Sequence, residues 1–498
     1  MDGLNYLQTF LATPLDEILR EQSSAAVEAR LLDLFQTVAE EVPAYRTFLL
    51  EQGINATRIE SLTQFQSLPL TTKSNYLQRY PLAEVCRQGR LENCDAIAVS
   101  SGSTGEPTFW LRSLADEFHI APRFEQVFRD SFAADRRRTL AVVCFALGTW
   151  VGGMYTANCC RHLALKGYPI TVVTPGNNKT EILRVVQKLS PLFEQTVLLG
   201  YPPFLKDVVD SGIAQGVPWP RYNVKWVMAG EVISEEWRAL VGQRVGSTHP
   251  CLDSASLYGT ADAGVLGNET PLSICIRRWL AEHPEASRDL FGESRLPTLV
   301  QYDPLSRFFE VRDGTLLFSG NNGIPLIRYH IADAGGVITY ERLLAFLARW
   351  GFDPIASLGP DVKIRKLPFV YVFGRAQFVV SYFGANVYPE NISVGLEQHP
   401  ICEWVTGKFV MMVRFDSDQN ESLAIAVELA PGIEASGEKQ QAIAESVRYH
   451  LCRLNSEFAN YVPADYQMPQ IQLRSTGDPE YFPVGVKHRY TRAPESGR

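Results

Sequence analysis

The sequence predicts an α/β protein. The expected arrangement is a large N-terminal domain of mainly parallel sheets covered by helices, with a β-rich subdomain, followed by a small α+β domain. Three observations predict it. Between residues 139 and 264, apolar runs alternate with amphipathic stretches, as in parallel sheets that are buried on both faces. From 298 to 340 short strands are joined by turns, and after about residue 374 strands and helices mix in a unit of about a hundred residues. We therefore expect domains at 1–373 and 374–498.

Composition narrows the class of protein. Of the 498 residues, 46% are hydrophobic and 20% are charged, which is typical of a globular protein with ample core. The net charge of −8 argues against a nucleic-acid-binding surface. No signal peptide or membrane span is evident in the sequence. Nine scattered cysteines without a CxxC pair indicate reduced thiols, so a cytoplasmic location is expected.

The first 65 residues are expected to be helical. Residues 25–41 carry apolar side chains at helical spacing, including Leu31, Phe35 and Val38. A second short helix is expected in the segment L-P-L-T-T-K-S-N-Y-L-Q-R-Y-P, where Thr72 stands at the capping position.

The alternating region supplies the framework of the large domain. Strands are expected at residues 139–147, 169–175, 196–201, 224–231 and 254–259, and helices at 180–189, 203–210 and 234–241. Ligands of such sheets bind at the carboxyl ends of the strands. Glycines stand at four of those ends, namely Gly148, Gly200, Gly230 and Gly259. We therefore expect the active site along this edge.

The later part of the chain changes character. Residues 308–320 predict a hairpin around Asp313-Gly314. The small domain is expected to contain strands at 378–382, 404–415, 422–429 and 469–474 and helices at 390–398 and 438–455.

A Ser/Gly-rich loop follows an apolar segment and reads S-S-G-S-T-G-E-P-T from Ser100 to Thr108. Glycines allow close approach of the backbone to a ligand, and successive N–H groups can surround an anion. The residues of interest are Ser101, Gly102, Ser103, Thr104 and Gly105. A phosphate-binding loop and an ordinary surface turn both fit this composition.

Further motifs follow in a fixed order: A-G-E (229–231), S-L-Y-G-T-A-D-A-G (256–264), P-L-I-R-Y-H-I-A-D (325–333) and F-G-R-A-Q-F-V-V-S-Y-F-G-A-N-V-Y-P (373–389). Together with the loop and a C-terminal lysine, they resemble the adenylate-forming superfamily of acyl-CoA synthetases and adenylation domains. The segment L-P-L-T-T-K before the loop brings the resemblance nearest to the phenylacetate–CoA ligase family.

The resemblance implies that ATP and a carboxylic acid form an acyl-AMP and pyrophosphate, and that a thiol, most often coenzyme A, then displaces AMP. It also implies a small domain that changes orientation between these two steps. The nucleotide contacts implied are the loop, Gly230 and Glu231 at adenine, Tyr258 stacked on adenine with Gly259 beside it, Asp333 at the ribose hydroxyls, and Arg375 near the domain junction. Asp262 matches the position of a Mg²⁺ ligand.

The resemblance identifies Lys487 as the residue that bridges the acid and the α-phosphate, where an ammonium can neutralise developing charge; Arg489 is a nearby competitor. Four positions depart from the common pattern. Glu106 stands where many members have lysine, Ala261 replaces a threonine, Asp262 replaces a glutamate, and Gln377 occupies a hinge position that is often aspartate.

The acid pocket is expected between the strand ends. Candidate lining residues are Phe145, Trp150, Tyr155 and Ala229, which would suit an aromatic or other apolar acid. Transfer of the acyl group to a carrier protein, an amine or an alcohol is an alternative. A nucleotide-binding protein without ligase activity is an alternative of another class.

Overall fold

A computed structural model describes residues 3–99, 108–149, 151–230, 232–293, 295–375, 380–383, 385–415, 421–455, 458–459, 462–483, 488–492 and 495–496. The chain begins with a group of helices. They are α1 (Gly3–Ala12), α2 (Leu15–Ile18), α3 (Ser24–Glu41), α4 (Pro43–Glu51) and α5 (Leu62–Gln66). Helix α3 confirms the helix predicted from the spacing of apolar residues, and it buries Leu31, Phe35 and Val38. Thr72 caps a short helical turn, as predicted, by accepting a hydrogen bond from the Asn75 backbone N–H at 3.0 Å.

A single mixed sheet forms the centre of the large domain. Among the described residues it has eleven strands in the order β10-β11-β12-β13-β9-β8-β7-β6-β5-β3-β4. Their bounds are β3 (Thr139–Val143), β4 (Ile170–Val173), β5 (Gln195–Gly200), β6 (Val224–Ala229), β7 (Ser254–Thr260), β8 (Gly264–Asn268), β9 (Thr298–Gln301), β10 (Arg307–Arg312), β11 (Thr315–Gly320), β12 (Leu326–Ile338) and β13 (Phe369–Arg375).

The half of the sheet from β4 to β7 is parallel. Helices α8 (Lys179–Leu189), α9 (Pro202–Ala214) and α10 (Glu235–Val245) cover one face, and α6 (Leu114–Gln126) and α7 (Val151–Leu165) cover the other. Strand β3 serves both cores, because Leu140 and Val142 pack on the first face while Ala141 and Val143 pack on the second. This alternation explains why the strand is apolar throughout.

The other half of the sheet, from β7 to β10, is antiparallel. The predicted hairpin is confirmed as β10 and β11, which are joined at Asp313-Gly314. The expected β-rich part of the large domain is present, and because β8 pairs antiparallel with β7, it belongs to the same sheet as the parallel half. Helices α11 (Pro271–Glu282), α12 (Pro284–Phe291), α13 (Tyr340–Arg349) and α14 (Pro354–Leu358) accompany this half.

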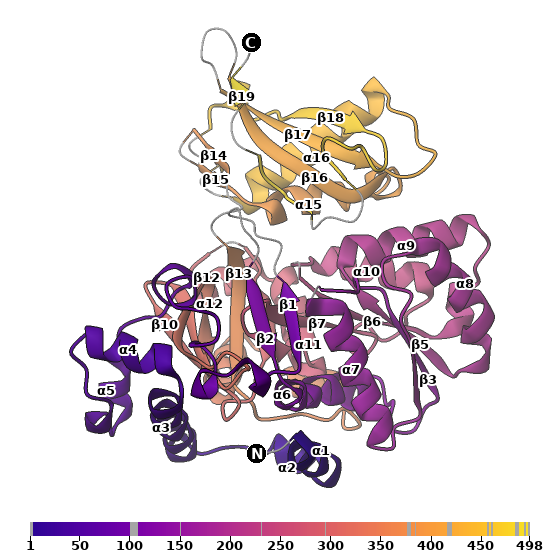
Figure 1. Ribbon diagram of the computed structural model, residues 1–498. Coiled ribbons are helices and arrows are strands. Elements are labelled where there is room, and N and C mark those ends of the chain that lie inside the picture. The colour runs from indigo at the N-terminus through magenta and orange to yellow at the C-terminus, as the bar shows by residue number, and fades with distance from the viewer. Residues whose placement is uncertain are drawn as a thin grey trace.

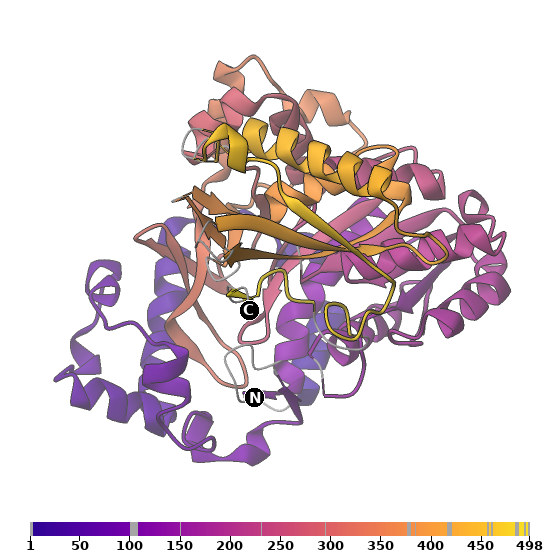
Figure 2. The same cartoon turned by 90° about the horizontal axis from the view of Figure 1, so that it is seen from above.

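The C-terminal domain is small and α+β, as predicted. It contains β14 (Val380–Tyr382), β15 (Ala385–Val387), α15 (Pro389–Leu396), β16 (Val405–Phe415), β17 (Glu421–Leu429), α16 (Gly437–Leu454), β18 (Gln470–Arg474) and β19 (Glu495–Ser496). It has its own core, in which Val447 and Leu451 of α16 meet Phe409 and Ile425 of the sheet. Figure 1 shows this domain at the top of the large one, and Figure 2 shows that it lies over the large domain.

None of the helices in the part of the chain that the structure describes is long and apolar enough to cross a membrane. All nine cysteines are free, and four of them are fully buried in the large domain: Cys86, Cys144, Cys159 and Cys160.

Candidate active site

Two residues predicted from distant motifs meet in the large domain. Tyr258, near the end of β7, donates a hydrogen bond from its hydroxyl to Asp333 Oδ2 of β12 at 2.7 Å. Both side chains are buried, with 8% and 5% of their surfaces exposed. The two residues lie 75 positions apart in the sequence, so only the fold brings the aromatic ring and the carboxylate together.

The segment between β7 and β8 forms a second contact with the same strand β12. Asp262 Oδ2 accepts a hydrogen bond from the Tyr329 hydroxyl at 2.6 Å. Arg112 of β2 (Phe109–Arg112) donates from Nη2 to the carbonyl oxygens of Ala261 and Asp262. The turn that carries Asp262 is therefore fixed from both sides. Gly259 is required here, because a Cβ would lie 2.6 Å from the Gly264 carbonyl oxygen.

The carboxyl ends of β5 and β6 form an adjoining surface. Gly230 follows β6 with φ of 89°, and a Cβ there would lie 2.7 Å from the Tyr201 ring. Tyr201 follows β5 and packs edge to face on Phe145, with ring centroids 5.0 Å apart. Glycine at position 230 is thus explained by its backbone conformation and by the neighbouring ring.

The residues predicted for the acid pocket that the structure describes surround this edge. Phe145 and Tyr155 belong to one hydrophobic cluster, and Ala229 packs against it from the end of β6. Burial raises the pKa of Tyr155 well above its usual value, and the nearby Asp116 carboxylate adds to this. Its hydroxyl therefore stays protonated, and it has no hydrogen-bond partner among the described residues.

Several predicted site residues lie outside the described residues, namely Ser101, Gly102, Ser103, Thr104, Gly105, Trp150, Glu231 and Lys487. The strands on either side of the Ser/Gly-rich loop are described. β1 (Ala96–Val99) and β2 pair as an antiparallel hairpin, and the Val99 N–H donates to the Thr149 carbonyl oxygen at 2.8 Å. The backbone of Arg375 pairs opposite Asp333 where β12 meets β13.

The oxygen ligands that the site offers can be compared with those that Mg²⁺ prefers. Among the described residues, no group of three or more His, Cys, Asp and Glu side chains gathers that could hold a metal ion. Asp262 offers a partly exposed carboxylate, the hard oxygen ligand that Mg²⁺ prefers. Mg²⁺ commonly takes one or two carboxylates and completes its coordination with phosphates and water. The residues present therefore fit a metal that arrives with a nucleotide.

Three residues of this site escaped the sequence analysis: Arg112, Tyr201 and Tyr329. Tyr201 immediately follows Gly200 at a predicted strand end, so its position alone could have indicated it. Tyr329 lies within the motif that ends at Asp333, but the sequence does not reveal its bond to Asp262. Nothing in the sequence distinguishes Arg112 from a surface arginine.

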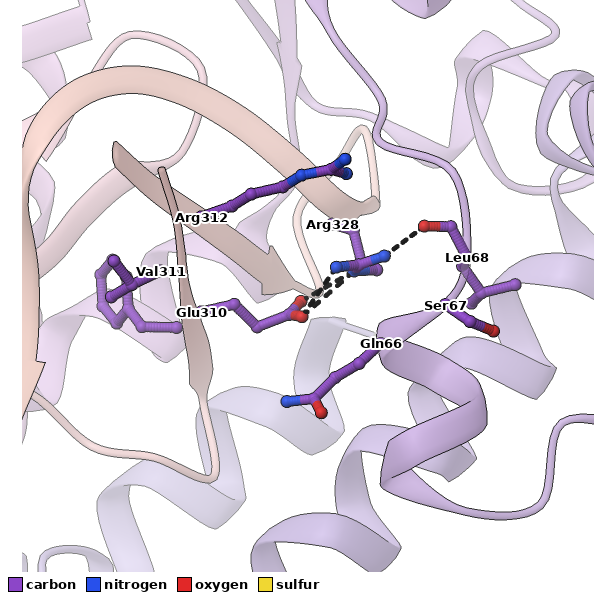
Figure 3. Close-up of a pocket in the computed structure, with 8 residues that line it drawn as sticks. Gln66, Ser67, Leu68, Glu310, Val311, Arg312 and Arg328 are labelled. Atoms are coloured by element: carbon purple, nitrogen blue, oxygen red, sulfur yellow. Dashed lines mark hydrogen bonds and ion pairs between the residues drawn. The ribbon is translucent and has the colours of Figure 1, made fainter. Parts of the chain in front are cut away.

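A cavity of about 660 Å³ lies elsewhere, between the end of α5 and strands β10 and β12. Figure 3 shows the Arg328 side chain between Glu310 and Leu68 in the lining of this cavity. Arg328 Nε donates to both carboxylate oxygens of Glu310, at 3.1 and 3.2 Å, and Nη1 donates to the Leu68 carbonyl oxygen. The guanidinium of Arg328 thus has hydrogen-bond partners within the protein, so we assign this residue a structural role and not a ligand.

The two domains meet through a buried lysine. Lys206 of α9 is 3% exposed, and Nζ contacts Asp210 at 2.8 Å. It also donates to the carbonyl oxygens of Cys402 and Val405 in the small domain, at 3.2 and 3.1 Å. Arg244 of α10 binds Asp210 and adds a longer bond to the Cys402 carbonyl oxygen, at 3.4 Å. We call these contacts the Lys206 junction.

We expect Lys206→Met to loosen the domain arrangement, because two backbone carbonyls of the small domain lose their buried cationic donor. Leaving such groups unpaired costs roughly 1–3 kcal/mol each. Small-angle scattering or a fluorescence distance between the domains should report a larger separated population. Lys225→Met is the matched control, since Lys225 is also buried and paired with a carboxylate, but only within the large domain. An equal change in both variants would contradict the role of the Lys206 junction.

A carboxyl at the same interface predicts pH dependence. Ser234 donates its hydroxyl to Glu397 at the end of α15. Burial raises the pKa of Glu397 from 4.5 to about 7, with Glu236 adding to the rise and Ser234, Arg277 and Lys206 opposing it. The proton therefore binds more tightly when the domains are together. Association should weaken as the pH rises from about 4.5 to about 7 and stay constant above that range. Small-angle scattering between about pH 4.5 and about pH 7 should measure this pH dependence of domain association. Glu397→Gln should abolish it.

No family model matches the chain. A curated protein, the phenylacetate-coenzyme A ligase of Thermus thermophilus, is 24% identical over 386 residues, which are 77% of each chain. Among solved structures, 2-hydroxyisobutyryl-CoA ligase in the postadenylation state with 2-HIB-AMP matches with a TM-score of 0.65 and 14% identity, over 95% of this chain and 89% of that one. The same enzyme with 2-HIB-AMP and CoA in the thioesterification state gives 0.54 and 15% identity, over 97% and 94%.

The predicted resemblance to acyl-CoA ligases is confirmed at the level of the fold, which the chain shares with 2-hydroxyisobutyryl-CoA ligase. The phenylacetate-coenzyme A ligase is similar over most of the length of both chains. Of the two states of 2-hydroxyisobutyryl-CoA ligase, the postadenylation state gives the higher TM-score.

Proposed function

We propose that this protein is an AMP-forming acid–thiol ligase. A carboxylate oxygen of the substrate acid attacks the α-phosphorus of ATP, the bond to the bridging oxygen breaks, and pyrophosphate leaves. The sulfur of coenzyme A then attacks the acyl carbon of the acyl-AMP, the thiol proton is lost, and AMP leaves. The observation that carries the proposal is the hydrogen bond between Tyr258 and Asp333, which belong to separate motifs, within a fold shared with 2-hydroxyisobutyryl-CoA ligase.

The described residues have distinct tasks in this proposal. The Asp333 carboxylate accepts hydrogen bonds from the ribose hydroxyls, because it has acceptor sites for two such donors in addition to Tyr258. The Tyr258 ring stacks on adenine, and Gly230 lets the backbone pass close to the base. Gly259 keeps the Asp262 turn close to β8.

Asp262 holds Mg²⁺, and its orientation is fixed by the Tyr329 hydroxyl. When bound, Mg²⁺ neutralises charge on the phosphates. The Ser101–Gly105 loop supplies backbone and hydroxyl donors to the β- and γ-phosphates, Glu231 contacts adenine, Arg375 reaches the ribose or the phosphates, and Lys487 bridges the acid and the α-phosphate. These assignments rest on the motifs alone.

The substrate proposed is an aromatic or other apolar carboxylic acid. The support is the hydrophobic cluster of Phe145 and Tyr155, with Ala229 at its edge. Trp150 belongs to the same proposal on its sequence position alone. The nine free cysteines support a reducing cytoplasmic location.

The domain division at residue 374 is also part of the proposal. In it the small domain has one orientation for adenylation and another for thioester formation. The present arrangement, which resembles a postadenylation state more than a thioesterification state, is assigned to the first step. The Lys206 junction would then open before the second step.

The experiment is a panel of aromatic and aliphatic acids incubated with ATP, Mg²⁺ and coenzyme A, with products identified by mass spectrometry. We expect AMP and an acyl-CoA in equal amounts, with saturation in coenzyme A. Accumulation of acyl-AMP that coenzyme A does not discharge would indicate a carrier protein, an amine or an alcohol as acceptor. Bound ATP without AMP formation would indicate a nucleotide-binding protein.

A further inference from the structure

A second cavity, lined by both apolar and polar side chains, lies in the large domain, at the packing of α3 and α6 against the turn before β10. Its volume is about 180 Å³. Its lining residues come from four separate segments of the chain, and the polar ones are Arg30, His119, Asp303, Ser306, Arg307, Ser319 and Asn321. Of the residues assigned above to the nucleotide or to the acid, those that the structure describes do not line this cavity.

Arg307 is a buried arginine in the lining of the cavity. It is 3% exposed, and Nη1 donates to the Ser306 carbonyl oxygen at 2.8 Å. Its Nε and Nη2 have no hydrogen-bond partner among the described residues. A buried guanidinium with unpaired N–H groups is costly, because the desolvation of those groups is not compensated. The edge formed by Nε and Nη2 is the one that binds two oxygens of an oxyanion at once.

Other donors converge from different elements. Arg30 of α3 lines the cavity with a partly exposed side chain that pairs with Asp33 at 3.1 Å. His119 of α6 has a buried Nδ1 without a partner among the described residues. Burial, with smaller contributions from Arg307, Arg30 and Arg87, lowers the pKa of His119 to about 4. Arg30 and Arg307 both lie near this imidazole, and their positive charge favours an anion in the cavity.

Asp303 is the one carboxylate that lines this cavity. Its Oδ1 accepts a hydrogen bond from the Leu305 N–H at 3.1 Å. A carboxylate repels a fully deprotonated anion such as sulfate. It can instead accept a hydrogen bond from an anion that still carries a proton, as phosphate does near neutral pH. The combination of Arg307 with Asp303 therefore selects between two anions of the same shape.

We propose that the cavity around Arg307 and Asp303 is a binding site for a small phosphate-type anion, either inorganic phosphate or pyrophosphate. Two oxygens bind the Nε–Nη2 edge of Arg307, Arg30 neutralises charge from the α3 side, and a protonated oxygen donates to Asp303. The volume equals that of about six waters at roughly 30 Å³ each, which suits a small inorganic anion. The proposal does not depend on the ligase activity proposed above.

The test is isothermal titration calorimetry of the full-length protein with inorganic phosphate, and with pyrophosphate in a parallel series. Arg307→Gln removes the charge and the forked edge and should weaken phosphate binding roughly tenfold to hundredfold. Arg312→Gln is the matched control, because Arg312 lies on the same strand with its side chain 58% exposed and lines the other cavity. It should leave binding unchanged. Whichever of inorganic phosphate and pyrophosphate binds more tightly is the anion that we assign to the site.

Arg30→Gln serves as a second variant, because Arg30 is 56% exposed and its replacement leaves the core intact. It should weaken binding severalfold. Phosphate bound at the nucleotide site would be insensitive to both variants, so equal affinity in the wild type, Arg307→Gln and Arg30→Gln would overturn the proposal. Absence of any binding would overturn it too. Sulfate should bind at least tenfold more weakly than phosphate, and equal affinities would contradict the role of Asp303.

Discussion

Asp333→Ala should raise the KM for ATP by roughly 10²- to 10⁴-fold, because the ribose loses two hydrogen bonds to a charged acceptor worth about 1.5–3 kcal/mol each. The same change leaves the Tyr258 hydroxyl without its acceptor at 2.7 Å. Steady-state pyrophosphate release as a function of ATP concentration measures the effect. The dependence on the acid should change little, since Asp333 has no role toward the acid in this account.

Asp333→Ala removes both the proposed ribose acceptor and the acceptor of the Tyr258 hydroxyl. Tyr258→Phe tests the loss of the Tyr258–Asp333 hydrogen bond while the carboxylate stays in place. This variant keeps the ring and removes the hydroxyl that donates to Asp333, so the KM for ATP should rise by at most about tenfold. Its circular dichroism and melting temperature should stay close to those of the wild type. If Asp333→Ala and Tyr258→Phe had the same modest effect, the carboxylate would be structural and would not bind the ribose.

Lys487→Ala should slow adenylation by roughly 10²- to 10³-fold, the usual cost of removing one donor that stabilises developing charge. Thioester formation from preformed acyl-AMP should change little, because pyrophosphate has already left in that half-reaction. Stopped assays of the two half-reactions measure each rate separately. Arg489→Ala is the control, since Arg489 is a cation two positions away. Equal losses in both half-reactions, or a larger loss in Arg489→Ala, would mean that the lysine was wrongly assigned.

Much of the fold could be predicted because its signal is local. Alternate residues of strand β3 pack into the hydrophobic cores on the two faces of the sheet. The strand is therefore almost entirely apolar and easy to recognise in the sequence. The hairpin at Asp313-Gly314 is defined by its turn. The continuity of the sheet could not be predicted, because it depends on the pairing of β7 with β8 and of β9 with β13, and the latter strands are far apart in the sequence.

Some features of the candidate site could likewise be predicted from local sequence, and others could not. Gly230 and Gly259 are recognisable at strand ends, and the structure adds the backbone and ring contacts that exclude a side chain there. The bonds from Tyr258 to Asp333 and from Tyr329 to Asp262 join distant segments, and no local pattern indicates them.

The roles of two buried charged residues outside the candidate site also could not be predicted from the sequence. Lys206 and Asp210 have the spacing of an ordinary exposed pair on a helix, but the small domain covers the lysine and supplies two carbonyl oxygens to it. Arg307 immediately precedes the predicted hairpin at 308–320 and resembles a solvated arginine in the sequence, but it is 3% exposed in the structure.

The most direct test of the central claim is acid-dependent exchange of labelled pyrophosphate into ATP by the purified full-length protein. If the motifs converge on one nucleotide and activate a carboxylate, at least one acid of a broad panel should drive exchange, and Asp333→Ala should abolish it at ordinary ATP concentrations. Exchange that occurs without acid, or none with any acid while ATP still binds, would contradict the account.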